Sequence, residues 1–240
     1  MADETATPRL SVVVPSFNEE QRLPRTIEAI ERYLEAVNVS YELILVDDGS
    51  ADGTRQIMDK AAERNRFVKV EANLHNQGKG RAIATGVAAA RGAEILITDA
   101  DLSTPIEELD KLQAALDNGA GVAIGSRSIK GSRVEISQPI YRQLMGKTFN
   151  LIVQALLLPG IWDTQCGFKL FRADVAHAAF AGLTSERFGY DPEVLYRVKK
   201  HGAKIAEVPV VWRNSAPTKV SPISSSLDML KDVLKVRFKV

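Results

Sequence analysis

Short apolar runs alternate with helical patterns along the first half of the chain. Runs rich in Val, Ile and Leu predict strands over residues 10–14, 41–46, 67–70, 94–98 and 121–124. Apolar residues at helical spacing predict helices over residues 23–36, 54–65, 80–90 and 106–118. Nearly continuous apolar strands that alternate with helices are typical of a parallel sheet covered on both faces. The first half therefore predicts an α/β fold.

The second half is less regular. Its polar stretches predict loops over residues 126–138 and 214–226. Its apolar spacing predicts helices over residues 139–158, 192–201 and 223–238, and a strand over 205–211. The chain contains no internal repeat, so we expect one domain over residues 1–240 with a long C-terminal extension.

Composition narrows the class of protein. The 240 residues are 45% hydrophobic and 25% charged, which is typical of a soluble globular protein and excludes a disordered one. The 31 basic and 30 acidic residues balance, so we expect no nucleic-acid partner. Residues 1–125 nevertheless carry a net charge of −8 and residues 126–240 one of +9. Either the second half has an interaction surface, or solvated faces merely differ in sign.

Several features bear on location. The single cysteine, Cys166, favours a reducing compartment, and residues 1–9 lack the pattern of a signal peptide. The longest apolar segment, 151–158, is much shorter than the ~20 residues of a membrane-spanning helix. We therefore expect a cytoplasmic protein. The basic residues of the predicted helix 223–238 add an expected peripheral contact with the cytoplasmic face of a membrane, unless its apolar stripe packs on the sheet.

Polar clusters follow the predicted strands at residues 15–20, 47–54, 99–101 and 125–127. They should meet, because ligands of parallel sheets bind at the carboxyl ends of the strands. Asp99 and Asp101 leave a strand on the same side, and paired carboxylates of this kind bind Mg²⁺ or Mn²⁺ together with substrate phosphates. Adjacent Asp47 and Asp48 repel each other unless they bind a cation, a sugar or a base edge.

The sequence disfavours several other kinds of nucleotide-binding and catalytic site. The segment Gly78-Lys79-Gly80 is not a Walker loop, because no Ser or Thr follows the lysine, and it fails the dinucleotide fingerprint. The three histidines form no metalloprotease motif, and the chain has no G-x-S-x-G sequence.

Spaced motifs over about residues 10–237 resemble the inverting glycosyltransferases of family 2, and within it the polyprenyl-phosphate (dolichyl-phosphate) glycosyltransferases. In the first half they are residues 12–19, 46–54, 76–80 and 99–101. In the second half, residues 125–127, 163–171 and 188–191 resemble the dolichyl-phosphate β-glucosyltransferases more than the mannosyl enzymes.

The resemblance implies a GT-A fold, which is a Rossmann-like, mostly parallel sheet with helices on both faces and a C-terminal acceptor-side extension. Residues 10–125 would then bind the nucleotide sugar and residues 126–240 the acceptor. The implied nucleotide-sugar residues are Pro15, Asn18, Glu19, Asp47, Asp48, Lys79 and Asp99, with Lys219 in a loop that could close over the diphosphate. Asp99 and Asp101 would bind Mg²⁺ or Mn²⁺.

The expected reaction moves a hexose, favoured as glucose from UDP-glucose, to a polyprenyl or dolichyl phosphate. A divalent ion on Asp101 and Asp99 would neutralise the leaving diphosphate. Arg127 and Arg142 could hold the acceptor phosphate. Asp191 is a candidate base near the sugar or acceptor, or simply an acid at a helix N-terminus.

Three alternatives remain open. The donor could be GDP-mannose, or the acceptor could be soluble or linked to a protein. A non-catalytic nucleotide-sugar-binding protein is a third reading, which the intact acidic pair disfavours.

Overall fold

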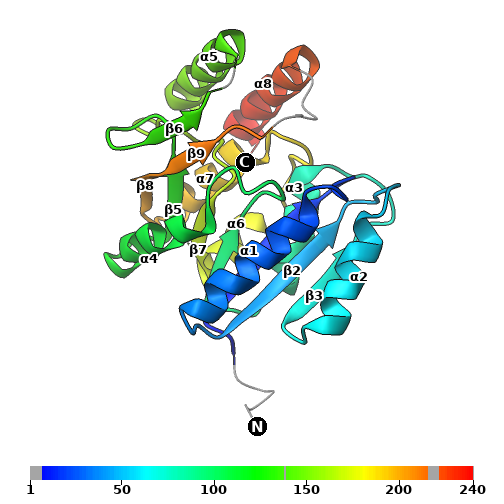
Figure 1. The fold of residues 1–240 in the computed structure, drawn as a ribbon. Helices are drawn as coiled ribbons and strands as arrows, with labels where there is room; N and C mark the ends of the chain where they lie inside the picture. The colour runs from blue at the N-terminus through cyan, green and yellow to red at the C-terminus, as the bar shows by residue number, and fades with distance from the viewer. Residues whose placement is uncertain (1–6, 138, 216–221, 240) are drawn as a thin grey trace.

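The computed structural model describes residues 7–137, 139–215 and 222–239. Over these residues a seven-stranded sheet has the order β3-β2-β1-β4-β7-β5-β8 (Figure 1). Its strands are β1 (Leu10–Ser16), β2 (Tyr41–Asp47), β3 (Val68–Ala72), β4 (Glu94–Ile97), β5 (Val122–Ser126), β7 (Lys169–Arg172) and β8 (Ile205–Pro209). Only β7 among them runs antiparallel to its neighbours, β4 and β5. The expected mostly parallel sheet is confirmed.

Helices cover both faces of this sheet because its central strands are apolar on both sides. Val12 of β1 and Leu43 of β2 face one core, whereas Val13 and Ile44 face the other. The first core is closed by α1 (Leu23–Ala36), α2 (Thr54–Arg64) and, after a 3₁₀ turn (Ile106–Glu108), α4 (Leu109–Asp117). The second is closed by α3 (Lys79–Ala89), α6 (Ala173–Phe180) and α7 (Tyr190–Lys200), with residues of α5 (Ile140–Leu156) and α8 (Pro222–Lys239).

Beyond the sheet lies a smaller layer built by the second half. β6 (Arg133–Ile136) pairs in parallel with β9 (Val211–Arg213), and α5 and α8 stand side by side next to this pair (Figure 1). This layer is the observed form of the C-terminal extension.

Several predicted boundaries in the second half were wrong. The predicted loop 126–138 contains β6. The predicted loop 214–226 overlaps the first residues of α8, which begins at Pro222. The predicted strand 205–211 divides after Pro209, because proline cannot donate to a strand ladder and the chain passes there to the other sheet. β7 and α6 were not predicted.

The structure tests one of the two interpretations of the C-terminal helix, the packing of its apolar stripe. Met229, Val233 and Val236 are buried in the second core, so this part of the stripe packs inside the protein. Leu234 and Phe238 remain exposed. No helix formed by the described residues is both long enough and apolar enough to span a membrane.

Candidate active site

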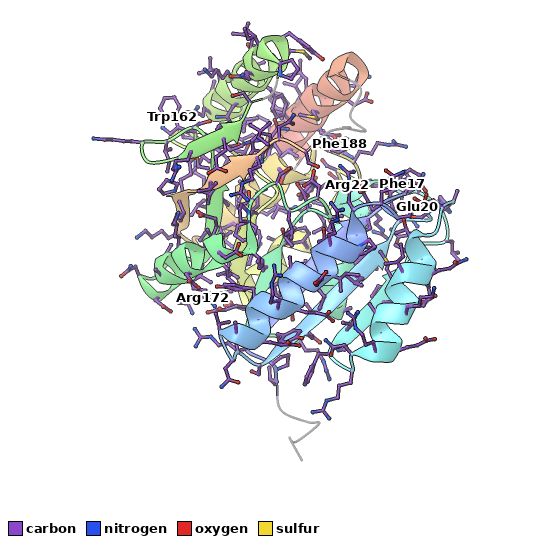
Figure 2. All side chains as sticks on the ribbon, in the orientation of Figure 1. Phe17, Glu20, Arg22, Trp162, Arg172 and Phe188 are labelled. Carbon is purple, nitrogen blue, oxygen red and sulfur yellow. The ribbon has the colours of Figure 1, made fainter. Side chains whose placement is uncertain are left out.

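A cavity of about 770 Å³ opens at the carboxyl ends of β1, β2 and β4. Segments far apart in the sequence form its walls: Figure 2 shows Phe17 and Arg22 near Phe188, and all three line the cavity. Of the sequence-predicted residues, the lining includes Pro15, Asn18, Glu19, Asp48, Lys79, Asp99, Asp101 and Arg127. The expected convergence of polar clusters is therefore what the fold produces.

Hydrogen bonds between two strand-end loops shape one wall. The Asn18 backbone N–H donates to Ser50 Oγ at 2.9 Å, and the Ala51 N–H donates to Asn18 Oδ1 at 2.8 Å. The Glu19 N–H donates to Thr54 Oγ1 at 2.7 Å. Asn18 has φ +54°, a left-handed conformation that asparagine tolerates better than most residues. The loop after β2 thus fixes the loop that presents Asn18 and Glu19 to the cavity.

The adjacent carboxylates Asp47 and Asp48 are held by backbone donors. Asp47 Oδ1 accepts from the Ser50 N–H at 3.0 Å. Asp48 accepts from the N–H groups of Gln77 (3.0 Å) and Gly78 (2.8 Å), which form the turn into α3. Gly78 has φ +105°, which a residue with a side chain rarely adopts. Asp48 thereby positions Lys79, whereas Asp47 is not among the lining residues, and its contact with a base stays a prediction.

Two basic side chains lie near the acidic pair, Asp99 and Asp101, which lines the cavity. Lys79 Nζ is 2.5 Å from Asp99 Oδ1, and Arg22 Nη1 is 3.8 Å from Asp101 Oδ2. Burial would raise the pKa of Asp99, but the Lys79 ammonium holds that pKa below its usual value. Burial and the neighbouring Asp99 charge instead raise the pKa of Asp101. Asp101 therefore carries negative charge that its surroundings compensate poorly, which favours a bound cation.

A glycine makes room for this pair. A Cβ atom at Gly167 would lie 2.1 Å from Asp99 Oδ2 and 2.5 Å from its carboxyl carbon. Because no real Cβ approaches another atom so closely, any side chain here must displace the Asp99 carboxylate. Gly167 belongs to the segment 163–171 on which the family resemblance partly rests.

Gly167→Ala is expected to lower transfer activity at least tenfold by moving Asp99 away from the cation site. Divalent-ion titration by calorimetry would show correspondingly weaker Mn²⁺ binding. Gly146→Ala is the matched control for Mn²⁺ binding, since a Cβ there meets nothing within 4 Å and Gly146 does not line the cavity that holds the acidic pair. Unchanged Mn²⁺ affinity in Gly167→Ala would contradict the assigned role of the glycine.

The charges of the cavity lining bear on whether a bound diphosphate would require a cation. Four lining residues are basic and four acidic: Arg22, Lys79, Arg127 and Arg187 against Glu19, Asp48, Asp99 and Asp101. A balanced lining leaves the charge of a nucleotide diphosphate uncompensated. The described residues contain no group of three or more metal-binding side chains. Two hard carboxylates nevertheless fit Mg²⁺ or Mn²⁺, whose remaining ligands are usually substrate phosphates and water.

Arg127 lies at the end of β5 and is held by a buried acid. Its Nε and Nη2 donate to the two carboxylate oxygens of Asp163 at 2.7 and 2.8 Å, and its backbone N–H donates to the same group at 2.9 Å. The guanidinium carbon lies 5.3 Å from the centre of the Trp212 ring. A guanidinium has five N–H donors, so others remain for a phosphate. Glu207 in turn accepts from the N–H groups of Trp162 and Asp163.

Asp191 lies apart from the cavity lining. It is buried in the first turn of α7 and accepts a hydrogen bond from Lys169 Nζ, which also donates to the Cys166 carbonyl at 2.5 Å. This placement matches an acid at a helix N-terminus that balances a buried lysine. Its role as a base stays a prediction. Cys166 is buried as well.

Two predicted residues escape placement. Lys219 lies outside the described residues. Arg142 belongs to α5, but its side chain is likewise outside the described part.

Sequence reasoning assigned no role to several residues of the site: Arg22, Asp163, Gly167, Arg187, Phe188 and Trp212. A signal existed for some of them, because Arg22 stands three residues after Glu19, to which it donates two hydrogen bonds. Asp163, Gly167 and Phe188 lie in the motifs of the second half.

Comparison with known proteins agrees with this geometry. The family described as Glycosyl transferase family 2 matches residues 11–180. The dolichyl-phosphate beta-glucosyltransferase of Homo sapiens is 37% identical over 98% of this chain and 77% of its own length. That of Dictyostelium discoideum is 35% identical over 96% of this chain and 74% of its own.

Solved structures show the same fold. Glucosyl-3-phosphoglycerate synthase from Mycobacterium tuberculosis, in complex with UDP, has a TM-score of 0.68 at 18% identity, covering 95% of this chain and 80% of its own. A mannosyltransferase from Pyrobaculum calidifontis, in complex with GDP-Man and Mn²⁺, has a TM-score of 0.58 at 21% identity, covering 90% and 59%. The predicted GT-A fold is confirmed. On the family match and the near full-length relatives, the chain belongs to glycosyl transferase family 2 and is a glycosyltransferase.

Proposed function

We propose that this enzyme transfers glucose from UDP-glucose to dolichyl phosphate or another polyprenyl phosphate, with Mg²⁺ or Mn²⁺. The observation that supports this most is the 35–37% identity, over nearly the whole chain, to two dolichyl-phosphate beta-glucosyltransferases. The balanced charges of the cavity and its acidic pair suit a nucleotide diphosphate bound with a divalent cation.

In this proposal the reaction is a direct displacement. The acceptor phosphate is ionised at neutral pH, so one of its oxygens can attack the anomeric carbon without a strong general base. As that bond forms, the bond from the anomeric carbon to the UDP oxygen breaks, and an α-linked donor gives a β-linked product. A cation held by Asp99 and Asp101 would stabilise the charge of the departing diphosphate. Lys79 adds a positive group beside Asp99.

The two halves of the chain would divide the substrates. In this proposal Pro15, Asn18, Glu19, Asp48 and Lys79 line the donor side, with Asp47 near the base and Lys219 near the diphosphate. Arg127 and Arg142 bind the acceptor phosphate. The support is the position of Arg127, which lines the donor cavity and also a second, smaller cavity built from residues 127–212.

Donor identity can be tested by competition calorimetry with Mn²⁺ present. UDP is expected to bind more tightly than GDP, and removal of Mn²⁺ with a chelator is expected to weaken UDP binding. Tighter binding of GDP would contradict the donor assignment and favour GDP-mannose.

We also propose peripheral contact with the cytoplasmic face of a membrane, where a polyprenyl phosphate keeps its head group. Large apolar side chains are exposed on α5 (Ile140, Leu144, Leu151) and near the end of α8 (Phe238, 79% exposed). Exposed basic residues on the same two helices are Lys147, Lys231, Lys235 and Arg237. Apolar and basic groups together suit an anionic lipid surface.

Sedimentation with anionic liposomes tests this contact. The protein is expected to pellet at low salt and to be released at high salt, because salt screens the attraction between basic residues and the anionic surface. Each basic residue near that surface contributes only about 1 kcal/mol. Neutralising Lys231, Lys235 and Arg237 together should abolish pelleting. Neutralising Lys60, Arg66 and Lys204, which are exposed outside α5 and α8, should not. Absence of pelleting at low salt would contradict the proposal and favour a soluble acceptor.

A further inference from the structure

A second cavity of about 370 Å³ adjoins the donor cavity. The two share Arg127, Gln165 and Trp212 as lining residues. Its other walls come from β6, α5 and the segment around Trp162, which Figure 2 shows near β6 and α5. Every lining residue lies between positions 127 and 212, in the half of the chain with a net charge of +9.

The charges of this cavity favour an anion. Its charged lining residues are Arg127, Lys147 and Asp163. Asp163 is compensated by its paired hydrogen bonds to Arg127. Lys147 has no ion pair or hydrogen bond with any residue in the described part of the chain. Because the charges of Arg127 and Asp163 cancel, Lys147 leaves the cavity lining with a net positive charge.

Amide donors face the same space. Gln154 lines the cavity, and its Nε2 is buried without a hydrogen-bond partner among the described residues. Gln165 Nε2 reaches only a weak acceptor, Met229 Sδ, at 3.8 Å. A buried donor without an acceptor costs free energy, and a bound phosphate oxygen would remove that cost.

The outer rim of the cavity is apolar. Val134, Leu151 and Trp162 line it and are 43%, 60% and 53% exposed. Exposed apolar groups of this size next to a cationic pocket match a ligand that is charged at one end and hydrocarbon at the other.

We propose that this cavity binds the phosphate end of the polyprenyl phosphate acceptor. The phosphate contacts Arg127, Lys147 and the Gln154 amide, and the first isoprene units lie against Trp162 and Leu151. The shared lining at Arg127 brings the phosphate next to the donor cavity. This inference rests on the proposed function and adds Lys147, Gln154 and Trp162 to the acceptor site.

The two tryptophans of the chain allow a direct test, since both line this cavity. In Trp212→Phe, fluorescence reports Trp162 alone. Farnesyl phosphate is expected to shift the Trp162 emission to shorter wavelength in a saturable titration. Farnesol and inorganic phosphate, added separately, should bind at least tenfold more weakly, because each supplies only half of the contacts.

Two substitutions test the phosphate contacts by calorimetry in the otherwise unsubstituted protein, which avoids reliance on Trp212→Phe. Lys147→Gln is expected to weaken farnesyl phosphate about tenfold, as for the loss of a hydrogen bond to a charged group. Lys60→Gln, on α2, is the matched control. Gln154→Leu should weaken binding about fivefold while the Tm stays the same or rises, because it removes an unsatisfied buried donor. If Gln154 served only to stabilise the fold, Gln154→Leu would lower the Tm.

Outcomes separate this inference from the proposed function. It is overturned if Trp162 does not respond to farnesyl phosphate, if Lys147→Gln binds like the parent, or if inorganic phosphate binds as well as farnesyl phosphate. UDP binding should be the same in Lys147→Gln and Gln154→Leu as in the parent, because neither residue lines the donor cavity. Suppose that the parent forms the glucosyl lipid while Trp162 fluorescence does not respond to farnesyl phosphate and Lys147→Gln binds it like the parent. In that case the proposed function stands and only the cavity assignment fails.

Discussion

Replacing Asp101 by Asn is expected to lower kcat by about 100- to 1000-fold, the usual cost of losing one group that stabilises transition-state charge. Asparagine keeps the shape of the side chain and removes the charge that binds the cation. The fold should remain intact, because the pKa of Asp101 is raised in the folded protein and the carboxylate is not a stabilising charge there. Steady-state kinetics together with a thermal melt would measure both effects.

Asp59→Asn provides the control for this substitution, since Asp59 lies outside the cavity lining and forms an exposed ion pair with Arg55 on α2. Near-normal turnover in Asp101→Asn would show that the carboxylate does not assist the departure of the diphosphate. A fall in both kcat and Tm would instead indicate a structural role.

Arg127→Ala is expected to lower the free energy of unfolding by about 3 kcal/mol, because it leaves the buried Asp163 carboxylate without its partner. It should also raise the KM for the acceptor more than the KM for UDP-glucose. The double variant Arg127→Ala, Asp163→Ala should recover much of the stability, since no buried charge is left unpaired. It should not recover the acceptor KM.

Denaturant unfolding and two-substrate kinetics on the parent, Arg127→Ala and the double variant separate the effect on stability from the effect on acceptor binding. If the double variant regains the acceptor KM, Arg127 acts only through the fold. If the KM for UDP-glucose rises alone, Arg127 contacts the donor diphosphate instead of the acceptor.

The sequence predicted the first half of the fold well because its strands are long, apolar and separated by periodic helices. The predicted helix 23–36 has the observed bounds of α1. β7 was missed because Leu170 and Phe171 lie between charged Lys169 and Arg172, in a strand too short to show a period. β6 was missed because its polar–apolar alternation, Arg133 to Ile136, is only four residues long and lies within a polar stretch, and all four residues are exposed.

The candidate site shows the same division. Asp99, Asp101 and Lys79 could be predicted to meet because parallel strand ends share one edge. The pairing of Arg127 with Asp163 could not, since it depends on how the segment after α5 returns across the sheet. The backbone donors of the adjacent carboxylates could not be predicted either: Asp47 accepts from the Ser50 N–H and Asp48 from the Gln77 N–H, and both depend on the fold of loops.

Product analysis tests the central claim most directly. The enzyme would be incubated with Mn²⁺, a short polyprenyl phosphate and, in separate reactions, radiolabelled UDP-glucose or GDP-mannose, and the organic phase would be analysed. The account predicts a labelled lipid from UDP-glucose alone, which mild acid cleaves to glucose and whose glycosidic linkage is β. No labelled lipid from UDP-glucose, with transfer from GDP-mannose or to a water-soluble acceptor instead, would contradict it.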